Sequence, residues 1–261
     1  RIEDLHARVH RGAYRALPSR RRYIPKPDGQ QRPLAVAALE DKIVQRATVA
    51  VLSAIFEEDF LGFSYGFRPK RSCHTALERA RSFFEDGNEW VVDLDLERFF
   101  DRVHHQRLLS RLSQRVKDKP LLSLIGRMLR ARVVMPDGVV VGTDEGVPQG
   151  GPLSPLLSNI VLDELDTELS RRGLRFVRYA DDCNIYVRSE AAGARVLASM
   201  TQFLEERLKL NVNAAKSAVA QPWHRKFLGY SLTAHKAPKL RIAPTSIERL
   251  KAKLLQSQGR P

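Results

Sequence analysis

The 261-residue sequence predicts an α+β protein in which an antiparallel sheet packs on helices. Segments with strand character are interleaved irregularly with helical segments, whereas a parallel sheet needs strands and helices in regular alternation. In addition, two Pro-Asp-Gly sequences, at 27–29 and 136–138, each lie between short strand-like segments. Proline presets φ and glycine accepts the strained position of a turn, so both sequences predict hairpins, which join antiparallel strands.

Turn residues, helix caps and the spacing of apolar residues define the expected elements of the first half of the chain. Ser72 is a suitable N-cap, because its side chain can accept a hydrogen bond from the first turn of a helix. The expected elements are two strands within 21–35, a helix over 41–55, a helix from Ser72 to about residue 84, a strand over 90–96, and mostly helical structure over 106–132 with an interruption near Pro120.

The same signals define the second half of the chain. The expected elements are a hairpin over 133–141, a helix from Ser154, a strand–turn–strand unit over 176–187, a helix over 191–208, a strand over 227–232, and a final helix that Thr245 and Glu248 open as a capping box. Residues 233–244 include two prolines and form the clearest linker in the sequence.

The charge of the chain is strongly positive and unevenly distributed. Lys plus Arg number 44 and Asp plus Glu number 30, which gives a net charge of +14 and favours a polyanionic partner such as nucleic acid. Residues 1–32 and 216–261 are basic, whereas 89–101 are rich in acids. This pattern fits solvated charged faces, or a positive channel that holds phosphates around a carboxylate–metal centre.

The composition excludes several classes of protein. Apolar residues make up 43% of the chain, which is enough for a sizeable core and excludes global disorder. Cys73 and Cys183 are too few for a disulfide scaffold or a four-cysteine zinc site. No apolar segment approaches the roughly 20 residues that span a bilayer, and no signal peptide is evident. We therefore expect a soluble protein of a reducing compartment without a membrane partner.

Three aspartates on two segments form the most informative pattern. Asp95 follows an apolar segment, and Asp181 and Asp182 lie at the tip of the expected strand–turn–strand unit. Adjacent acids between apolar segments are costly unless something pairs with them, and three converging carboxylates suit Mg²⁺. Alternatively, a lone Asp-Asp pair is an ordinary polar turn. Of the nearby acids, Asp101 is expected to be structural, and Asp93 to face away from the site or to lie near the edge of the sheet.

Around these acids, a series of ordered motifs resembles those of reverse transcriptases. Tyr-Ala-Asp-Asp at 179–182 resembles the YxDD box of that family. Segments 24–34 and 64–69 resemble the fingers. Segment 95–101 resembles the first metal-binding motif of the palm, 146–157 resembles the PQG…SPLL motif, and 210–217 resembles a later palm motif. Segment 227–230 resembles the primer grip. The Ser-Tyr-Gly-Phe-Arg-Pro and Pro-Gln-Gly-Gly segments are most similar to the enzymes of bacterial group II introns.

The resemblance implies the right-hand polymerase fold. The fingers would comprise residues 1–90, with part of 106–150 returning to the fingers or palm. The palm, which is the catalytic core, would comprise 91–232. Residues 233–261 would hold the exit from the primer grip and a truncated start of the thumb.

The resemblance also implies the catalytic roles. Asp95 and Asp181 would be metal ligands, Asp182 would complete the acidic set, and the carbonyl of Leu96 would supply a further ligand. Two Mg²⁺ ions, with Mn²⁺ as a substitute, would assist nucleotidyl transfer. Lys216 would protonate the departing pyrophosphate, although a lysine at such a turn is also an ordinary surface residue.

Five residues resemble the nucleotide-binding positions of the family. Phe100 would pack under the sugar of the incoming nucleotide and exclude a 2′-hydroxyl by its bulk, while its neighbour Phe99 is expected in the core. The other positions are Lys26 and Arg32, for the triphosphate, and Gln149 and Gly150, whose loop would approach the nucleotide and templating base. For Lys26, an exposed lysine without a specific role is a comparable interpretation.

A further set of residues would bind primer or template. Some lie on the expected fingers and some at the palm, and the aromatic residues among them equally suit a sheet core. This set comprises Arg20, Arg21, Arg22, Arg68, Tyr179, Phe227, Leu228, Gly229 and Tyr230.

Together, the resemblance implies an RNA-directed DNA polymerase encoded by a group II intron of a mobile element. Its partners would be an RNA template, a DNA or RNA primer, deoxynucleoside triphosphates, and the intron RNA that it binds to assist splicing and retrohoming. The resemblance implies a location in the bacterial cytoplasm, and it leaves open whether the protein forms an oligomer. The alternatives are an RNA-binding maturase whose polymerase site is unused, and a CRISPR-associated reverse transcriptase. Intact acids argue against the first, because an unused site has no need for their mutual repulsion.

Overall fold

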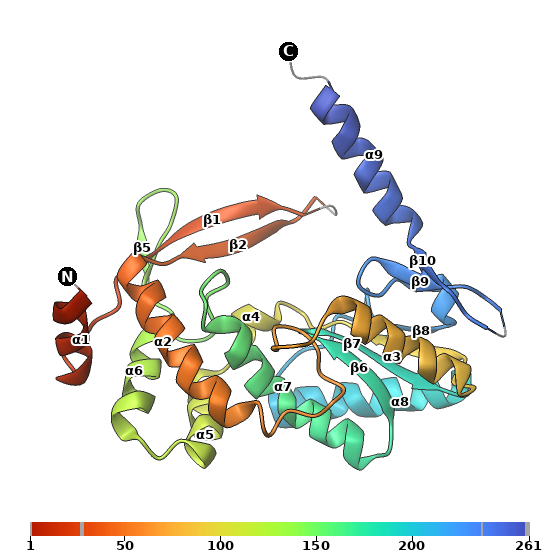
Figure 1. Cartoon of the computed structure of the whole chain (residues 1–261), viewed down its shortest axis with the longest axis horizontal. Helices are drawn as coiled ribbons and strands as arrows, with labels where there is room; N and C mark the ends of the chain where they lie inside the picture. Colours follow the sequence, from red (N-terminus) through yellow and green to blue (C-terminus); the bar gives the residue numbers. More distant parts are fainter. Residues whose placement is uncertain (1, 27–28, 236, 259–261) are drawn as a thin grey trace. The chain divides into compact units, whose positions relative to one another are not determined.

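The computed structural model describes residues 2–26, 29–235 and 237–258, and these form two compact units. Unit 1 comprises Arg1–Phe60 and Arg98–Glu164, and unit 2 comprises Leu61–Glu97 and Leu165–Pro261. Helices and mainly antiparallel sheets make up both units (Figure 1), as the predicted α+β class requires. How the predicted fingers, palm and thumb divide the chain stays a prediction.

Unit 1 contains a four-stranded sheet in the order β2-β1-β4-β5. Its strands are β1 (Ser19–Pro25), β2 (Gln31–Val36), β4 (Val133–Val134) and β5 (Val140–Val141). Both predicted hairpins are confirmed, since β1–β2 and β4–β5 pair antiparallel, whereas β1 and β4 pair parallel. The predicted turn residues Pro27 and Asp28 lie outside the described residues.

The break between α5 and α6 lies near Pro120, as the sequence predicts. Asp118 caps α6 through the backbone N–H of Leu121, and Pro120 stands in its first turn, which separates α6 from α5. The helices of this unit are α1 (Ile2–His10), α2 (Leu39–Phe56), α4 (Phe99–Arg102), α5 (His105–Arg115) and α6 (Lys119–Leu129), and α7 (Ser154–Arg171) begins here and continues into unit 2.

Unit 2 is built on a second four-stranded sheet, in the order β6-β7-β3-β8, with antiparallel pairing throughout. Its strands are β3 (Trp90–Leu94), β6 (Arg175–Tyr179), β7 (Asp182–Val187) and β8 (Ala218–Ala220). The remaining elements are α3 (Cys73–Glu85), α8 (Glu190–Phe203), a π-helical turn (Leu204–Leu208), a 3₁₀ turn (Pro222–His224), the hairpin of β9 (Tyr230–Leu232) and β10 (Leu240–Ile242), and α9 (Pro244–Gln258).

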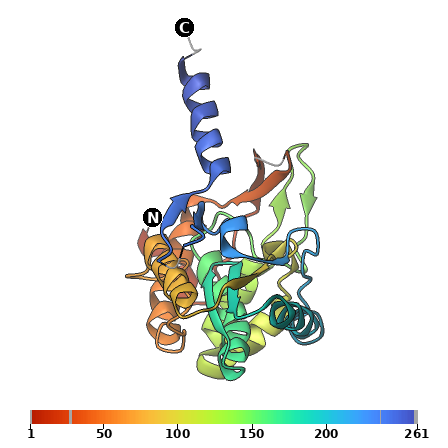
Figure 2. The same cartoon turned by 90° about the vertical axis from the view of Figure 1, so that its right-hand side faces the viewer.

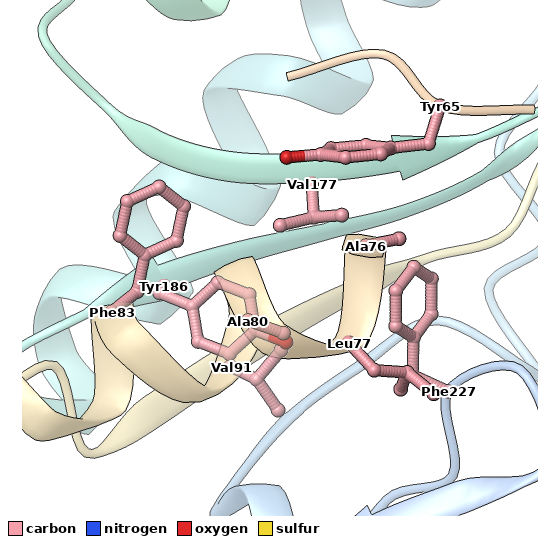
Figure 3. Close-up of a cluster of buried hydrophobic side chains, with 9 residues drawn as sticks. All are labelled: Tyr65, Ala76, Leu77, Ala80, Phe83, Val91, Val177, Tyr186 and Phe227. Atoms are coloured by element: carbon pink, nitrogen blue, oxygen red, sulfur yellow. The ribbon is translucent and has the colours of Figure 1, made fainter. Parts of the chain in front are cut away.

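The two views place α3 and α8 on opposite faces of this sheet (Figures 1 and 2). Because side chains alternate along a strand, Val91, Val177 and Tyr186 share the face under α3. They form a buried cluster with Tyr65, Ala76, Leu77, Ala80, Phe83 and Phe227 (Figure 3). On the other face, α8 packs so closely that a Cβ on Gly193 would lie 2.4 Å from Cγ1 of Val219.

The C-terminal part of unit 2 departs from the sequence prediction. The expected linker 233–244 contains β10, which pairs with β9, because its few apolar residues find a partner strand that local sequence does not reveal. The expected strand 227–232 is shorter, since residues 227–230 form a tight turn. Thr245 does not cap the last helix, because α9 already begins at Pro244. None of the described helices is both long and apolar enough to cross a membrane.

Candidate active site

The acid pair of unit 2 stands at the end of the β6–β7 hairpin. Ala180 and Asp181 form the two-residue turn, and Asp182 is the first residue of β7, opposite Tyr179. Ala180 has a φ of 57°, a region that non-glycine residues rarely occupy. This turn directs two consecutive carboxyl groups to one end of the sheet.

The strand register brings the third acid to the same end of the sheet. In the antiparallel pair of β3 and β7, Asp93 lies opposite Asn184 and Leu94 opposite Cys183. Continued by one residue, this register sets Asp95 opposite Asp182. Two segments that are more than 80 residues apart in the sequence therefore place their acids side by side.

Residues 211–217 fix the backbone of Asp95 on its other side. The Asp95 N–H donates to Oγ of Ser217 at 3.0 Å, and the Asp95 carbonyl accepts from the Asn213 N–H at 2.9 Å. Lys216 is an exposed residue of this same segment, and its N–H donates to the carbonyl of Asn213, which is itself bonded to Asp95. The anchoring roles of Asn213 and Ser217 were not predicted, because neither residue type signals a partner 120 residues away.

Of the two positions expected for Asp93, the one that faces away from the site is wrong. Residues two apart in a strand lie on the same face, so Asp93 shares the face of Asp95 instead of facing away. Its carboxylate accepts from Nε and Nη2 of Arg225 at 3.0 and 2.6 Å. Burial raises the pKa of the Asp93 carboxyl, and the paired Arg225 opposes that shift.

Electrostatic repulsion accumulates at Asp182. The pKa of its carboxyl is raised to about 7, chiefly by desolvation and then by the negative charges of Asp181, Asp93 and Asp95. The residue is nevertheless exposed, so a cation from solvent can reach it, and water screens part of the repulsion. A site of this kind gains stability from a bound cation.

The carboxylates fit a hard divalent cation in chemistry, although they are not arranged as a finished metal site. Carboxylate oxygens are the ligands that Mg²⁺ prefers, and mutual repulsion among them is relieved by positive charge. Among the residues that the structure describes, no group of three or more His, Cys, Asp or Glu side chains is arranged to hold a metal ion. The strand register and the turn place the backbones of Asp95, Asp181 and Asp182 at one end of the sheet, and their role as metal ligands stays a prediction.

The raised pKa of Asp182 predicts how stability depends on pH. Because its folded pKa of about 7 exceeds the unfolded value, the folded state binds more protons between about pH 4 and pH 7. The contribution of Asp182 to stability is therefore present at low pH and is lost as pH rises through 7. We measure the free energy of unfolding in urea, with a chelator present, at pH 5 and at pH 8. The decrease between the two pH values is expected to be larger for the wild type than for Asp182→Asn. Equal decreases would contradict the raised pKa of Asp182.

A fully buried ion pair supports the turn of the acids. Nε and Nη2 of Arg178 donate to both carboxylate oxygens of Asp166 on α7, at 2.7 and 2.6 Å. The same guanidinium donates to the carbonyl of Ala180 at 2.7 Å and to Oγ of Ser64 at 2.8 Å. This pair was not predicted, although an arginine within the apolar strand β6 and an aspartate on the apolar face of a helix were signals of it.

The loop 61–68 also holds the turn. The Arg178 N–H donates to the Phe63 carbonyl, and the Tyr65 N–H donates to the Arg178 carbonyl, both at 2.9 Å. A Cβ on Gly66 would lie 2.3 Å from the Ala180 nitrogen, so glycine is required for this close approach. Arg68 is buried and donates to the carbonyls of Leu61 and Ser64, which gives it a role in the loop. Its predicted contact with the template stays a prediction.

The segment that resembles a primer grip is a tight turn. Phe227 and Tyr230 exchange backbone hydrogen bonds of 2.8 and 2.9 Å, and Leu228 and Gly229 both have positive φ, as in hairpin turns of type I′. The Phe227 side chain belongs to the buried cluster of Figure 3, as the alternative interpretation expected. Tyr179 and Tyr230 pack partly buried against this cluster.

In unit 1, the loop of Gln149 and Gly150 is tied to its neighbours through backbone hydrogen bonds. The Ala35 N–H of β2 donates to the Gln149 carbonyl at 2.7 Å, and the Val147 N–H donates to the Phe100 carbonyl at 2.6 Å. Gly150 has a φ of 106°, a conformation that favours glycine. This loop therefore holds together the two regions of unit 1 in which nucleotide-binding residues were predicted.

The other predicted residues of unit 1 lie on α4 and on the β1–β2 hairpin. Phe99 is buried, as expected, while Phe100 is only partly buried, with the two rings 5.2 Å apart. Four arginines, Arg20, Arg21, Arg22 and Arg32, lie on the two paired strands, and Lys26 follows β1. Their roles toward nucleotide and template stay predictions.

Comparison with known families finds one family model, and its match includes the predicted acids and the residues that support their turn. A family model described as reverse transcriptase (RNA-dependent DNA polymerase) matches residues 24–232. This range includes Asp95, Asp181 and Asp182 together with Arg178, Asp166 and the loop of Gly66.

Two curated relatives illustrate the similarity. YkfC of Escherichia coli K12 is 35% identical over 246 residues, which cover 80% of this chain and 64% of YkfC. The group II intron-encoded protein LtrA of Lactococcus lactis subsp. cremoris is 39% identical over 168 residues, which cover 64% of this chain and 28% of LtrA. The chain thus spans less than two thirds of the length of either relative.

A solved structure shares the fold. Telomerase from Candida tropicalis, in complex with a fragment of telomeric RNA, has a TM-score of 0.66 to this chain. The superposition covers 92% of this chain and 48% of the telomerase chain, at 14% sequence identity. At this identity the likeness concerns the fold alone, and it agrees with the α+β architecture.

Proposed function

Because the chain belongs to the reverse transcriptase family, we propose that it catalyses RNA-templated synthesis of DNA from deoxynucleoside triphosphates. The observation that supports this proposal is the β3–β7 register, which, continued by one residue, would set Asp95 opposite Asp182 and beside Asp181 in the turn. Purified protein is expected to extend a DNA primer on an RNA template in the presence of Mg²⁺. Failure to extend any primer on RNA under these conditions would refute the polymerase function.

In the proposed reaction, the primer 3′-hydroxyl attacks the α-phosphate of the nucleotide and pyrophosphate departs. Asp95, Asp181 and Asp182, with the Leu96 carbonyl, would hold two Mg²⁺ ions, for which Mn²⁺ could substitute. When bound, these ions supply positive charge for the attacking and leaving oxygens. The carboxylates would fix the place of this charge, since strand pairing holds the Asp182 backbone and hydrogen bonds hold the Asp95 backbone.

Lys216 is proposed to donate a proton to the departing pyrophosphate. Its segment is joined to Asp95 by the hydrogen bond of Asn213, and its own carbonyl accepts from Arg225 at 2.7 Å. These contacts hold the backbone of an exposed residue, from which the ammonium group would reach a substrate phosphate.

Phe100 is proposed to select deoxynucleotides by its bulk. Phe100→Ala is expected to improve the use of a ribonucleotide relative to the matching deoxynucleotide by roughly tenfold or more, because the ring would no longer collide with a 2′-hydroxyl. The ratio of kcat/KM for the two nucleotides measures this effect. Phe100→Tyr keeps the bulk and should keep the selectivity, and an unchanged ratio in Phe100→Ala would remove Phe100 from this role.

The name of the relative LtrA supports a group II intron as the setting of this activity. In this setting the chain would also bind intron RNA to assist splicing and retrohoming, and its net charge of +14 suits such a partner. The second candidate is a maturase without polymerase activity. Such a protein would need only to bind RNA, and the basic charge of the chain suits that role. If protein that extends no primer still promotes splicing of an intron RNA, the second candidate is correct.

A further inference from the structure

Four arginines surround one open hollow in unit 1. Arg15, Arg127, Arg130 and Arg132 line a volume of about 290 Å³, and its other lining residues are the small Ala16, Pro18 and Ala131. This volume is far larger than the roughly 10–15 Å³ that a single water molecule needs, so a group larger than water can enter it from solvent.

The fold of unit 1 brings these arginines together from two parts of the sequence. Ser19 donates its N–H to the Arg132 carbonyl at 2.9 Å, where β1 begins to run parallel to β4. This pairing lays residues 15–18 against the connection between α6 and β4. Arg127 on α6 is bonded to the residues just before this segment, since its Nη1 donates to the Gly12 carbonyl at 3.3 Å.

The positive charge of the hollow is not neutralised by the described part of the chain. No acidic residue lines it, and none of its four arginines forms an ion pair with a described carboxylate. Elsewhere in unit 1, by contrast, Arg111 is paired with Asp163 and Arg115 with Asp59.

One arginine of the hollow also carries an unsatisfied donor. Nε of Arg127 is buried and, within the described residues, has no hydrogen-bond partner. A buried donor without a partner is costly, so an anion that reaches Nε would stabilise Arg127. The carboxyl end of α6 contributes a partial negative charge of only about half a unit, against four full positive charges.

We propose that this hollow binds a backbone phosphate of a nucleic acid. Guanidinium groups match phosphate oxygens with paired hydrogen bonds, which explains why arginine in particular suits such a site. The inference rests on the proposed function only in that the chain acts on nucleic acid. The hollow has no part in the chemistry of nucleotide transfer, and it fixes where a bound strand or helix lies on unit 1.

The test compares two pairs of exposed arginines that carry the same charge. The double variant Arg15→Gln/Arg130→Gln removes charge from the hollow, and Arg188→Gln/Arg195→Gln removes it from unit 2. Because all four residues are exposed, thermal unfolding should show both variants folded. Filter binding is measured with an RNA hairpin and with a DNA duplex of the same sequence, over a series of KCl concentrations.

The hollow variant is expected to bind about tenfold or more weakly at low salt, because charged hydrogen bonds to phosphate are lost. Its slope of log affinity against log salt should also fall by about one, as one phosphate contact predicts. The control pair should stay within about twofold of the wild type, since isolated exposed charges are screened.

The two probes identify the nucleic acid. A loss with the RNA hairpin alone assigns the site to RNA, whereas equal losses with both probes assign it to phosphate in either nucleic acid. Equal weakening by the hollow and control variants, or no weakening by the hollow variant, would overturn the proposal. Primer extension by the wild type is measured in parallel, so that failure of the polymerase function can be told from failure of this site.

Discussion

Asp181→Asn is expected to lower primer extension on an RNA template by on the order of 10³-fold or more. The substitution keeps the size of the side chain and removes one of the three carboxylates that the β3–β7 register and the β6–β7 turn bring together. It should also leave the protein folded, because it relieves repulsion at Asp182 instead of creating a cavity. Rates of single-nucleotide addition at saturating Mg²⁺ measure the loss.

Asp101→Asn is the matched control for this variant. It removes the same charge from an exposed residue of the same acidic sequence, which we interpret as structural. Its extension rate should stay close to that of the wild type. If both variants retain activity, the acid pair at the turn does not carry the reaction.

Arg178→Met is expected to destabilise unit 2 by about 3–5 kcal/mol, because it leaves the Asp166 carboxylate buried without its partner. The midpoint of urea unfolding measures this change. The double variant Arg178→Met/Asp166→Leu should recover part of the loss, since it removes both buried charges. Activity should fall with Arg178→Met even where the protein is folded, because the guanidinium also holds the Ala180 carbonyl of the turn.

Arg171→Met provides the contrast. Arg171 forms an ion pair with Glu168 on the surface of α7, where such pairs contribute little to stability. The midpoint of urea unfolding of Arg171→Met should therefore lie close to that of the wild type. A loss in Arg178→Met no greater than in Arg171→Met would show that the buried pair does not support the fold.

The sequence was sufficient for elements whose signals are local. Pro-Asp-Gly specifies a turn through its own dihedral preferences, and Ser72 caps α3 through the N–H of Thr75, three residues away. The acidic and Tyr-Ala-Asp-Asp segments were found in the same way, because a run of polar residues between apolar ones is visible without a partner.

The features that escaped prediction depend on partners that are distant in the sequence. β10 is a strand only because β9 lies beside it, and Ser217 serves Asp95 across more than 120 residues. Arg178 could be recognised in the sequence as a charged residue within an apolar strand. Its partner Asp166 on α7 could be identified only from the structure. The error at Asp93 was of another kind, since strand periodicity already placed it on the face of Asp95.

The most direct test of the central claim is to map a metal ion bound at Asp95, Asp181 and Asp182. Fe²⁺ that replaces Mg²⁺ generates hydroxyl radicals with ascorbate and peroxide, and these radicals cut the backbone close to the ion. We predict cuts near residue 95 and near residues 181–182, suppressed by excess Mg²⁺ and absent in Asp181→Asn. Cuts at only one of these places, or cuts that persist unchanged in the variant, would contradict a shared cation site.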